Sequence, residues 1–329
     1  MIHKRDAKDW ARANLKGLFT SPMIPFKADF KLDEAGIRHN VERMLQVKAS
    51  GLGFGFSEPW VLSIEERKRA LEVAVDAARR RVVAYVHTTD HSVEETINLT
   101  KHAEAVGADA VMIWIPYEWA KSQEMICDYY EYVAAKVDIA IFAYNTYHAG
   151  ISMTPETVVR LAKIPNICAL KDAVNDVDHT LRCIEVCGDQ IVVSASNEEF
   201  LLKMTLEHNQ QVMLGTTSVF LMQSPHYQPI QEYWELARQG KAEEATRKYQ
   251  ELQPLREVWG TMYQVLRDKH AATHPLPQIK YWMDLIGMAG GPVRPPMHPI
   301  TDEQKARLKA KIEATGWLER LYPKQSRAA

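Results

Sequence analysis

The sequence predicts an α/β fold, a (β/α)8 TIM barrel with a helical C-terminal extension. Eight apolar runs rich in β-forming residues recur between Gly17 and Leu221, and stretches with apolar residues at every third or fourth position separate them. The runs are continuously apolar, which is typical of parallel strands covered on both faces. A doubly wound open sheet is the alternative, but the glycines of "GLGFGF" do not form the GxGxxG fingerprint of dinucleotide-binding sheets.

The predicted strands follow one another at the spacing of β-α units. In chain order they are "GLFTSPMI" from residue 17, "GLGFGF" from 51, "RVVAYVHT" from 81, "DAVMIWIP" from 109, "IAIFAYN" from 139, "ICALK" from 167, "IVVSAS" from 191 and "QVMLGTT" from 211. Two of the intervening helices open with capping-box spacing, Ser63 with Glu66 and Ser92 with Glu95.

We expect three regions in the chain. Residues 1–16 form an N-terminal extension, residues 17–221 the barrel core, and residues 222–329 the final barrel helix and the C-terminal helical extension. In the last region "YWELARQGKAEEATRKYQELQPLREVWGTMYQVL" predicts two helices broken near Gly240, and helical patterns follow at 277–287 and 301–315.

Composition excludes several classes of protein. With 46% hydrophobic and 25% charged residues and a net charge of −2, the chain is typical of a globular protein without a general attraction to nucleic acid or anionic membranes. Neither a secretory signal nor a membrane span is present in the sequence, so a cytoplasmic location is expected. Four cysteines without CxxC spacing predict reduced thiols.

The ends of the fifth and sixth predicted strands carry the candidate chemistry, because reacting groups in such barrels lie at the C-terminal strand ends. Lys171 follows the apolar run of residues 167–170. A buried lysine tends to lose its proton and becomes a nucleophile. Tyr144 would relay protons to and from a carbinolamine or an enamine. The alternatives are a strand-end lysine with its charge in water and a tyrosine of the core.

Three further strand ends offer binding groups. At strand 2, the backbone N–H groups of Gly55, Phe56 and Ser57 could hold a carboxylate, although a tight turn explains the glycine equally well. At strand 7, Ser196 and Asn197 could contact substrate hydroxyls. A helix cap is favoured there, because Ser196 and Glu199 have capping-box spacing. Strand 8 is expected to bring Leu214 and Gly215 to the barrel mouth.

Together these strand ends resemble the dihydrodipicolinate synthase and N-acetylneuraminate lyase family, the pyruvate-type class I aldolases. The similarity runs from about Gly17 to Leu318, through "SPMIPF", "EPWVLSIEER", "GADAVMIWIPY", "AYN", "ALKD" and "GMAGGPVRPP". The resemblance implies a Schiff base between Lys171 and the ketone carbon of a 2-oxo acid such as pyruvate, with Tyr144 as the acid/base group. It implies a homotetramer, and it requires neither a metal nor a cofactor.

The sequence departs from the family pattern at the proton relay. Where the family usually has Gly-Thr-Thr-Gly-Glu, residues 54–58 read "FGFSE", so the relay threonine is missing. Glu118 replaces a second tyrosine that usually follows the "PY" pair. No arginine stands where the lysine-pathway enzymes bind a second carboxylate, and His148 is the nearest candidate. These departures argue against dihydrodipicolinate synthesis.

Aromatic residues cluster at or just beyond the strand ends: Phe56, Trp60, Trp114, Trp119 and Tyr147. They suit a bulky or aromatic aldehyde, unless they fill subunit interfaces. The expected function is a pyruvate-linked aldolase or hydratase-aldolase. A 2-oxo-3-deoxy sugar acid dehydratase or sugar-acid lyase, and a non-catalytic 2-oxo acid binding protein, are the alternatives. A metal site in "HTTDH", residues 87–91, is not favoured because neighbours diverge at a strand end.

Overall fold

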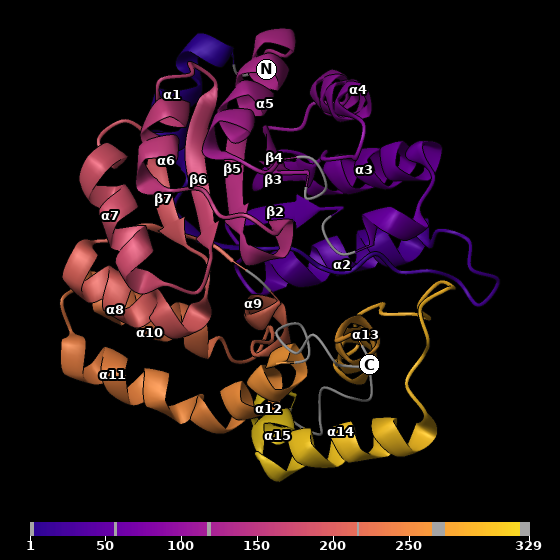
Figure 1. Cartoon of the computed structure of the whole chain (residues 1–329). Coiled ribbons are helices and arrows are strands. Elements are labelled where there is room, and N and C mark those ends of the chain that lie inside the picture. The colour runs from indigo at the N-terminus through magenta and orange to yellow at the C-terminus, as the bar shows by residue number, and fades with distance from the viewer. Residues whose placement is uncertain (1–2, 56–57, 117–119, 216, 265–273, 323–329) are drawn as a thin grey trace.

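The computed structural model describes residues 3–55, 58–116, 120–215, 217–264 and 274–322 (Figure 1). Its eight strands are parallel and lie in the order β7-β6-β5-β4-β3-β2-β1-β8. Each predicted run coincides with one strand, although β5 and β6 extend beyond the ends of their runs, so the barrel prediction is confirmed. The strands are β1 Gly17–Thr20, β2 Gly51–Phe54, β3 Val83–His87, β4 Ala110–Trp114, β5 Ala140–Thr146, β6 Ile167–Ala173, β7 Val192–Ala195 and β8 Val212–Leu214.

Side chains bridge the seam between β7 and β8, the two ends of the hydrogen-bonded order. The hydroxyl of Ser194 lies 3.1 Å from the carbonyl oxygen of Val212 and accepts from the N–H of Leu214 at 3.0 Å. The amide of Gln210 accepts from the N–H of Ala195 at 2.9 Å and donates to its carbonyl at 3.2 Å. These contacts satisfy buried backbone groups at the point where the barrel closes.

Helices surround the barrel and follow the strands in sequence (Figure 1). The capping box of Ser63 and Glu66 has both of its side-chain-to-backbone hydrogen bonds. At the next helix, the Ser92 side chain accepts a hydrogen bond from the Glu95 N–H. The helices of the barrel are α2 Glu34–Gln46, α3 Ile64–Ala78, α4 Val93–Ala105, α5 Gln123–Lys136, α6 Pro155–Ala162, α7 Val177–Cys187, α8 Glu198–His208, α9 Ser218–Leu221 and α10 Pro229–Arg238, with 3-10 turns η2 Pro59–Val61 and η3 Tyr147–Ala149.

The N-terminal extension closes one end of the barrel. Residues Lys4–Asp6 form the turn η1 and Ala7–Asn14 form α1. Trp10 of α1 stacks on Phe142 of β5 with ring centroids 6.3 Å apart, and Leu15 is fully buried in the cluster that fills the barrel. Figure 1 shows α1 at the opposite end of the molecule from α12, α14 and α15. The other end of the barrel is therefore the one that faces the C-terminal helices.

The C-terminal extension has one more break than the sequence predicted. The break at Gly240 is present, with a φ of 75°. The second predicted helix ends at Glu251 and a third begins at Gln253, because Pro254 has no N–H to continue the ladder. The extension consists of α11 Ala242–Glu251, α12 Gln253–Gln264, α13 Leu276–Leu285, α14 Asp302–Ala314 and α15 Trp317–Leu321.

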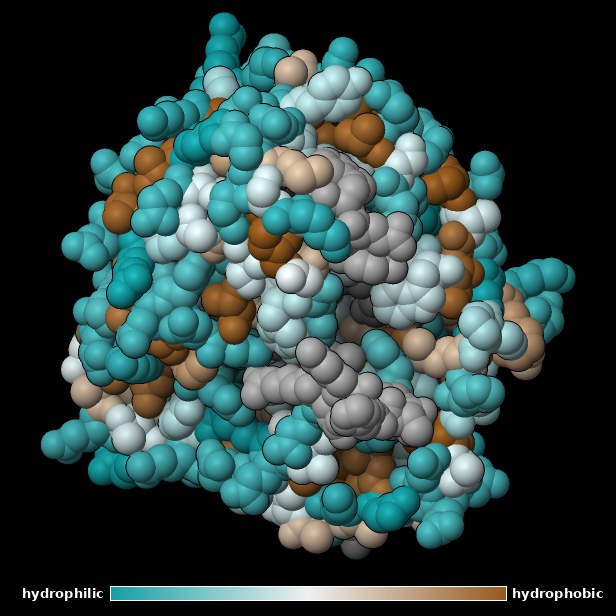
Figure 2. Space-filling model, in the orientation of Figure 1, coloured by the Kyte–Doolittle hydropathy of each residue, from teal (hydrophilic) through white to brown (hydrophobic). Residues whose placement is uncertain are grey.

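The barrel interior is a packed core. Tyr85 lies 5.9 Å from Phe19 and 5.6 Å from Phe142 between ring centroids, and all three side chains are buried. All four cysteines are buried and free. Hydrophilic residues dominate the face in Figure 2, where hydrophobic ones lie singly or in small groups. Within the described ranges no helix is both long and apolar enough to cross a bilayer.

Replacing Ser194 by alanine tests the seam. The variant loses the hydroxyl that satisfies the backbone at Val212 and Leu214, so we expect the free energy of unfolding to fall by about 1–3 kcal/mol. Urea unfolding measures this change. Thr246→Ala on the exposed face of α11 is the control, with an expected change within about 0.5 kcal/mol. Equal effects of the two variants would show that the Ser194 bridge does not hold the seam.

Candidate functional site

Lys171 and Tyr144 lie side by side at the barrel mouth. They are register partners on β6 and β5, and Trp114 on β4 is the register partner of Tyr144. The Lys171 side chain is 5% exposed, and its Nζ lies 4.4 Å from the centroid of the Tyr144 ring. The same nitrogen donates to the carbonyl oxygen of Gly215 at 3.4 Å. The structure thus brings together four residues that the sequence placed at different strand ends.

Burial sets the protonation of this pair. Removal from water lowers the pKa of Lys171 to about 8, because the charged ammonium is the form that desolvation penalises. Burial raises the pKa of Tyr144 to about 12, against the opposing effect of a hydrogen bond with Thr146. Near neutral pH a useful fraction of the lysine is therefore an uncharged nucleophile, and the phenol keeps its proton.

The mouth contains two neighbouring lobes, which share three lining residues. The first, the apolar lobe, has a volume of about 330 Å³ and contains Lys171 with Met23, Trp60, Trp114, Pro275, Leu276 and Ile279. The second, the polar lobe, has a volume of about 220 Å³ and is lined by Thr146, Tyr147, Asn175, Ser196, Asn197 and Glu199. Tyr144, His148 and Tyr263 border both. A ligand attached to Lys171 can therefore extend toward either an apolar or a hydrogen-bonding wall.

Two predicted mouth residues lie elsewhere. Leu214 is fully buried in the barrel interior with Phe19 and Tyr85, because side chains alternate along β8 and this one points inward below the mouth. Gly55 lines a separate cavity of about 30 Å³ behind β2. Its φ of 82° is the left-handed conformation that favours glycine. Phe56 and Ser57, like Trp119, lie outside the described residues.

The capping box expected at β7 does not form. Helix α8 begins at Glu198 after Asn197, whose side chain makes no capping hydrogen bond. Ser196 is 1% exposed, and its hydroxyl has no hydrogen-bond partner in the described part of the chain. Because Ser196 lines the polar lobe, its hydroxyl can bind a ligand there.

The sequence did not indicate that the C-terminal extension forms part of the mouth. Trp259, Tyr263, His274 and Leu276 of this region line the lobes. Trp259 and Tyr263 stack with ring centroids 4.3 Å apart. Their spacing of four residues predicts a shared helix face, but a single sequence does not show what that face covers.

A buried ion pair anchors the segment that follows β2. Glu58 and Lys280 are each 1% exposed and lie 3.0 Å apart. Lys280 also donates to the carbonyl oxygens of Ile24 and Pro292, each at 2.9 Å. All three ammonium protons thus have acceptors, and the Glu58 carboxylate opposes the burial that lowers the pKa of Lys280. Lys280 is therefore a structural lysine, in contrast to Lys171.

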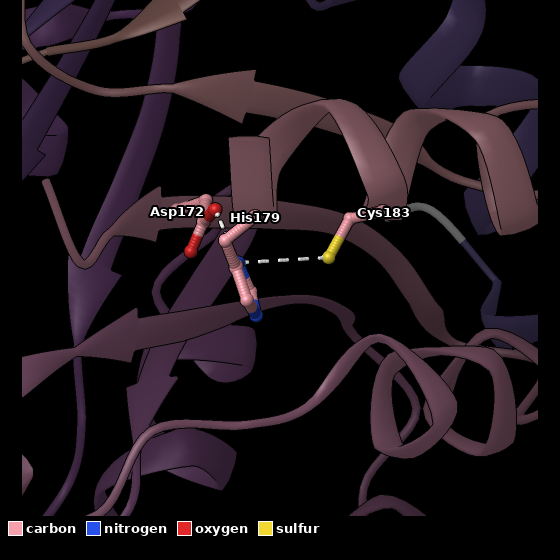
Figure 3. A group of neighbouring side chains, drawn as sticks. All are labelled: Asp172, His179 and Cys183. Atoms are coloured by element: carbon pink, nitrogen blue, oxygen red, sulfur yellow. Dashed lines mark hydrogen bonds and ion pairs between the residues drawn. The ribbon is translucent and has the colours of Figure 1, made fainter. Parts of the chain in front are cut away.

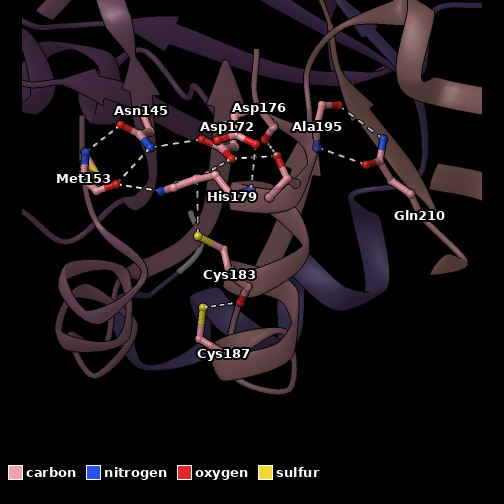
Figure 4. A network of polar contacts seen from close by, with 10 residues as sticks. Asn145, Met153, Asp172, Asp176, His179, Cys183, Cys187, Ala195 and Gln210 are labelled. Atoms are coloured by element: carbon pink, nitrogen blue, oxygen red, sulfur yellow. Dashed lines mark hydrogen bonds and ion pairs between the residues drawn. The ribbon is translucent and has the colours of Figure 1, made fainter. Parts of the chain in front are cut away.

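A second polar network lies behind the mouth (Figures 3 and 4). His179 on α7 places Nδ1 2.9 Å from a carboxylate oxygen of Asp172 and Nε2 2.8 Å from the carbonyl oxygen of Met153. Asn145 donates to the other oxygen of Asp172 at 3.0 Å. Both ring nitrogens face acceptors, so both carry protons and His179 is a cation. The pKa of His179 is accordingly raised, chiefly by its hydrogen bond to Asp172.

This network supports the reactive pair from the opposite face of the sheet. Asp172 follows Lys171 and Asn145 follows Tyr144, and successive strand residues point to opposite faces. Asp172, His179 and Cys183 offer ligand atoms within 4.8 Å of one another, as a metal site would. A cationic imidazole has no lone pair for a metal, however, so the contacts of His179 indicate an ion pair.

The first test concerns the burial of Lys171. Lys171→Met keeps the apolar stem and removes the charge, so we expect the free energy of unfolding to rise by up to about 3 kcal/mol at pH 6. Burial lowers the folded-state pKa of Lys171 to about 8. The stability difference between Lys171→Met and the wild type should therefore shrink as pH rises above 8, and vanish once the lysine of the unfolded chain also loses its proton. Urea unfolding from pH 6 to pH 10 measures it. A pH-independent difference would contradict burial of the charge.

The second test concerns His179. His179→Gln leaves Asp172 without its cation, so we expect a loss of about 3 kcal/mol of stability at pH 6. Asp172 raises the folded-state pKa of His179 to about 11, so the stabilisation is complete below pH 6.5 and declines steadily as pH rises toward 11. Urea unfolding at several pH values follows this decline.

His102→Gln serves as the control, because His102 is only partly buried and lies 3.1 Å from the partly exposed carboxylate of Glu72. That pair should contribute less than about 1 kcal/mol. If His179→Gln lost no more stability than His102→Gln, His179 would not be a cation in the folded protein.

Comparisons with known proteins agree with this geometry. The model of the dihydrodipicolinate synthetase family matches residues 14–315. The 4-hydroxy-tetrahydrodipicolinate synthase of Methanothrix thermoacetophila is 32% identical over 297 residues, which cover 89% of this chain and 95% of that protein. The synthase of the same name from a strain of Thermus thermophilus is 30% identical over 320 residues, with 95% and 100% coverage.

Solved structures give the same assignment. The crystal structure of YagE, a prophage protein of E. coli K12 that belongs to the dihydrodipicolinic acid synthase family, was determined in complex with pyruvate. It superposes with a TM-score of 0.80 at 28% identity, over 92% of this chain and 99% of that one. The chain therefore belongs to the dihydrodipicolinate synthetase family and is a lyase of the class I aldolase type.

Proposed function

We propose that the protein binds a pyruvate-type 2-oxo acid as an imine on Lys171 and makes or breaks a carbon–carbon bond between this acid and an aldehyde. The observation that carries the proposal is the buried Lys171 amine, 4.4 Å from the Tyr144 ring in a cavity of about 330 Å³. The pyruvate complex of the related YagE supports it.

Lys171 supplies the nucleophile and Tyr144 moves the protons of a balanced cycle. The neutral amine of Lys171 adds to the ketone carbon and gives a carbinolamine. Its hydroxyl leaves as water with the proton of Tyr144, which leaves an iminium and a phenolate. The phenolate then takes a proton from the adjacent methyl carbon, and the iminium becomes an enamine. The enamine carbon attacks the aldehyde, and Tyr144 returns its proton to the new alkoxide. Water then hydrolyses the iminium, which releases the product and the neutral Lys171 amine, and the proton freed in this step restores the Tyr144 phenol.

The apolar lobe favours a bulky or aromatic aldehyde. Trp114, Leu276 and Ile279 border the same space as Lys171, and apolar walls suit an apolar ring. Among the described residues of both lobes, Lys171 is the only lysine or arginine. A second carboxylate on the substrate would thus have no permanent cation to meet, which argues against the activity named for the Methanothrix and Thermus relatives.

The polar lobe favours a second candidate, cleavage or dehydration of a 2-oxo-3-deoxy sugar acid. Ser196 lines this lobe and its buried hydroxyl has no hydrogen-bond partner among the described residues, and Asn197 and Glu199 line the same lobe. A substrate chain with several hydroxyl groups would satisfy these groups, whereas an aromatic ring would not.

Borohydride trapping tests the imine. Incubation with pyruvate and borohydride, followed by peptide mass analysis, should give a reduced adduct on Lys171. Lys280 is the internal control, because it is equally buried but ion-paired with Glu58, and should stay unmodified. An adduct on other lysines only, or none at all, would contradict the proposal.

A substrate panel separates the candidates. We expect carbon–carbon bond formation from pyruvate and benzaldehyde to exceed that from pyruvate and glyceraldehyde. The opposite order would favour the sugar-acid candidate. Formation of 4-hydroxy-tetrahydrodipicolinate from pyruvate and a third aldehyde, one that carries an amino group and a carboxylate, would assign the activity of the named relatives instead. Pyruvate release or consumption, followed by chromatography of the products, measures all three.

A further inference from the structure

Tyr263 on α12 brings a second phenol into the mouth. It is half-buried and borders both lobes, as Tyr144 does. Its position is fixed by Arg256, about two helical turns earlier on the same helix face. Arg256 donates two hydrogen bonds of 2.7 Å to the carboxylate of Glu198, and both side chains are 3% exposed. This buried ion pair holds α12 against the start of α8, so Tyr263 has a defined place over the mouth.

A directional pair of hydrogen bonds orients the Tyr263 hydroxyl. The indole N–H of Trp259 donates to the Thr217 hydroxyl oxygen at 2.9 Å, and that oxygen lies 2.8 Å from the hydroxyl oxygen of Tyr263. Thr217 precedes α9 but its side chain makes no capping bond there. Its hydroxyl is therefore free to serve Trp259 and Tyr263.

The order of donors follows from the chemistry of the three groups. An indole N–H can only donate, so Thr217 accepts from Trp259. A hydroxyl that accepts a hydrogen bond becomes a better donor. Either hydroxyl of the Thr217–Tyr263 pair can donate, and Thr217 is the donor when a carbonyl oxygen in the cavity accepts the phenol proton. The phenol proton is then left to point into the cavity. Burial raises the pKa of Tyr263, so this proton is retained at neutral pH.

We propose that Tyr263 donates a hydrogen bond to the carbonyl oxygen of the second substrate, the oxygen that becomes an alkoxide when the new carbon–carbon bond forms. This inference rests on the proposed function. In the step, the enamine electron pair forms the carbon–carbon bond, the carbonyl π pair moves onto oxygen, and the nitrogen of Lys171 becomes an iminium. Tyr263 stabilises the developing negative charge and keeps its proton, while Tyr144 supplies the proton that completes the hydroxyl.

This role separates the two halves of the reaction. Imine and enamine formation with pyruvate need Lys171 and Tyr144, and no second carbonyl is present in that half. Exchange of the pyruvate methyl protons with D2O reports this half by NMR. Bond formation with the aldehyde, in contrast, needs the Tyr263 hydroxyl.

Tyr263→Phe tests the proposal, since it keeps the ring and removes only the hydroxyl. In this variant the yield of borohydride adduct and the rate of methyl-proton exchange should stay within about threefold of wild type. The kcat/KM for the aldehyde should fall about 100-fold or more. The aldehyde is whichever of benzaldehyde and glyceraldehyde the wild-type enzyme accepts. Tyr132→Phe is the matched control, because Tyr132 is exposed and bonds Glu94 at the surface. It should leave both halves unchanged.

Thr217→Val provides the second variant. It keeps the phenol but removes its orienting partner, so the aldehyde step should slow by a smaller factor than in Tyr263→Phe while exchange continues. The inference would be overturned if Tyr263→Phe turned over the aldehyde at the wild-type rate. It would also be overturned if this variant lost methyl-proton exchange and aldehyde turnover by equal factors. Absence of the Lys171 adduct in the wild-type protein would instead overturn the proposed function.

Discussion

The structure depends on the burial of one amine. A lysine at the end of a barrel strand normally extends its charge into water, but Lys171 lies within the mouth against the ring of Tyr144 and is 5% exposed. Desolvation makes the neutral amine accessible near neutral pH, and the neutral amine is the form that attacks a ketone. Three features maintain this environment: the closed seam of the barrel, the polar network behind the mouth and the C-terminal helices that cover the mouth.

Two buried ion pairs support the site from different sides. Asp172 and His179 join β6 to α7 directly behind the reactive residues, and Asn145 connects β5 to the same carboxylate. Glu58 and Lys280 fasten the segment after β2 to α13. Both pairs consist of charges that are already satisfied, so they position the chain without competing with Lys171 for substrate.

Most of the fold and the centre of the site could be predicted from the sequence, because their signals are local. Continuous apolar runs mark buried parallel strands, and Lys171 and Tyr144 stand where such strands end. The errors arise where a nonlocal contact decides. Leu214 lies one layer deeper than expected, Ser196 lacks its capping bond, and Tyr263 reaches the mouth only because Arg256 docks α12 on Glu198. No spacing in the sequence reports such a long-range contact.

The most direct test of this account is the titration of Lys171 itself. NMR of lysine labelled at the side chain, with Lys171→Met to assign the signal, gives its pKa in the free enzyme. The account predicts a value of about 8. A value near the roughly 10.4 of a free lysine would show that the amine is exposed to water and charged, and would contradict the central claim.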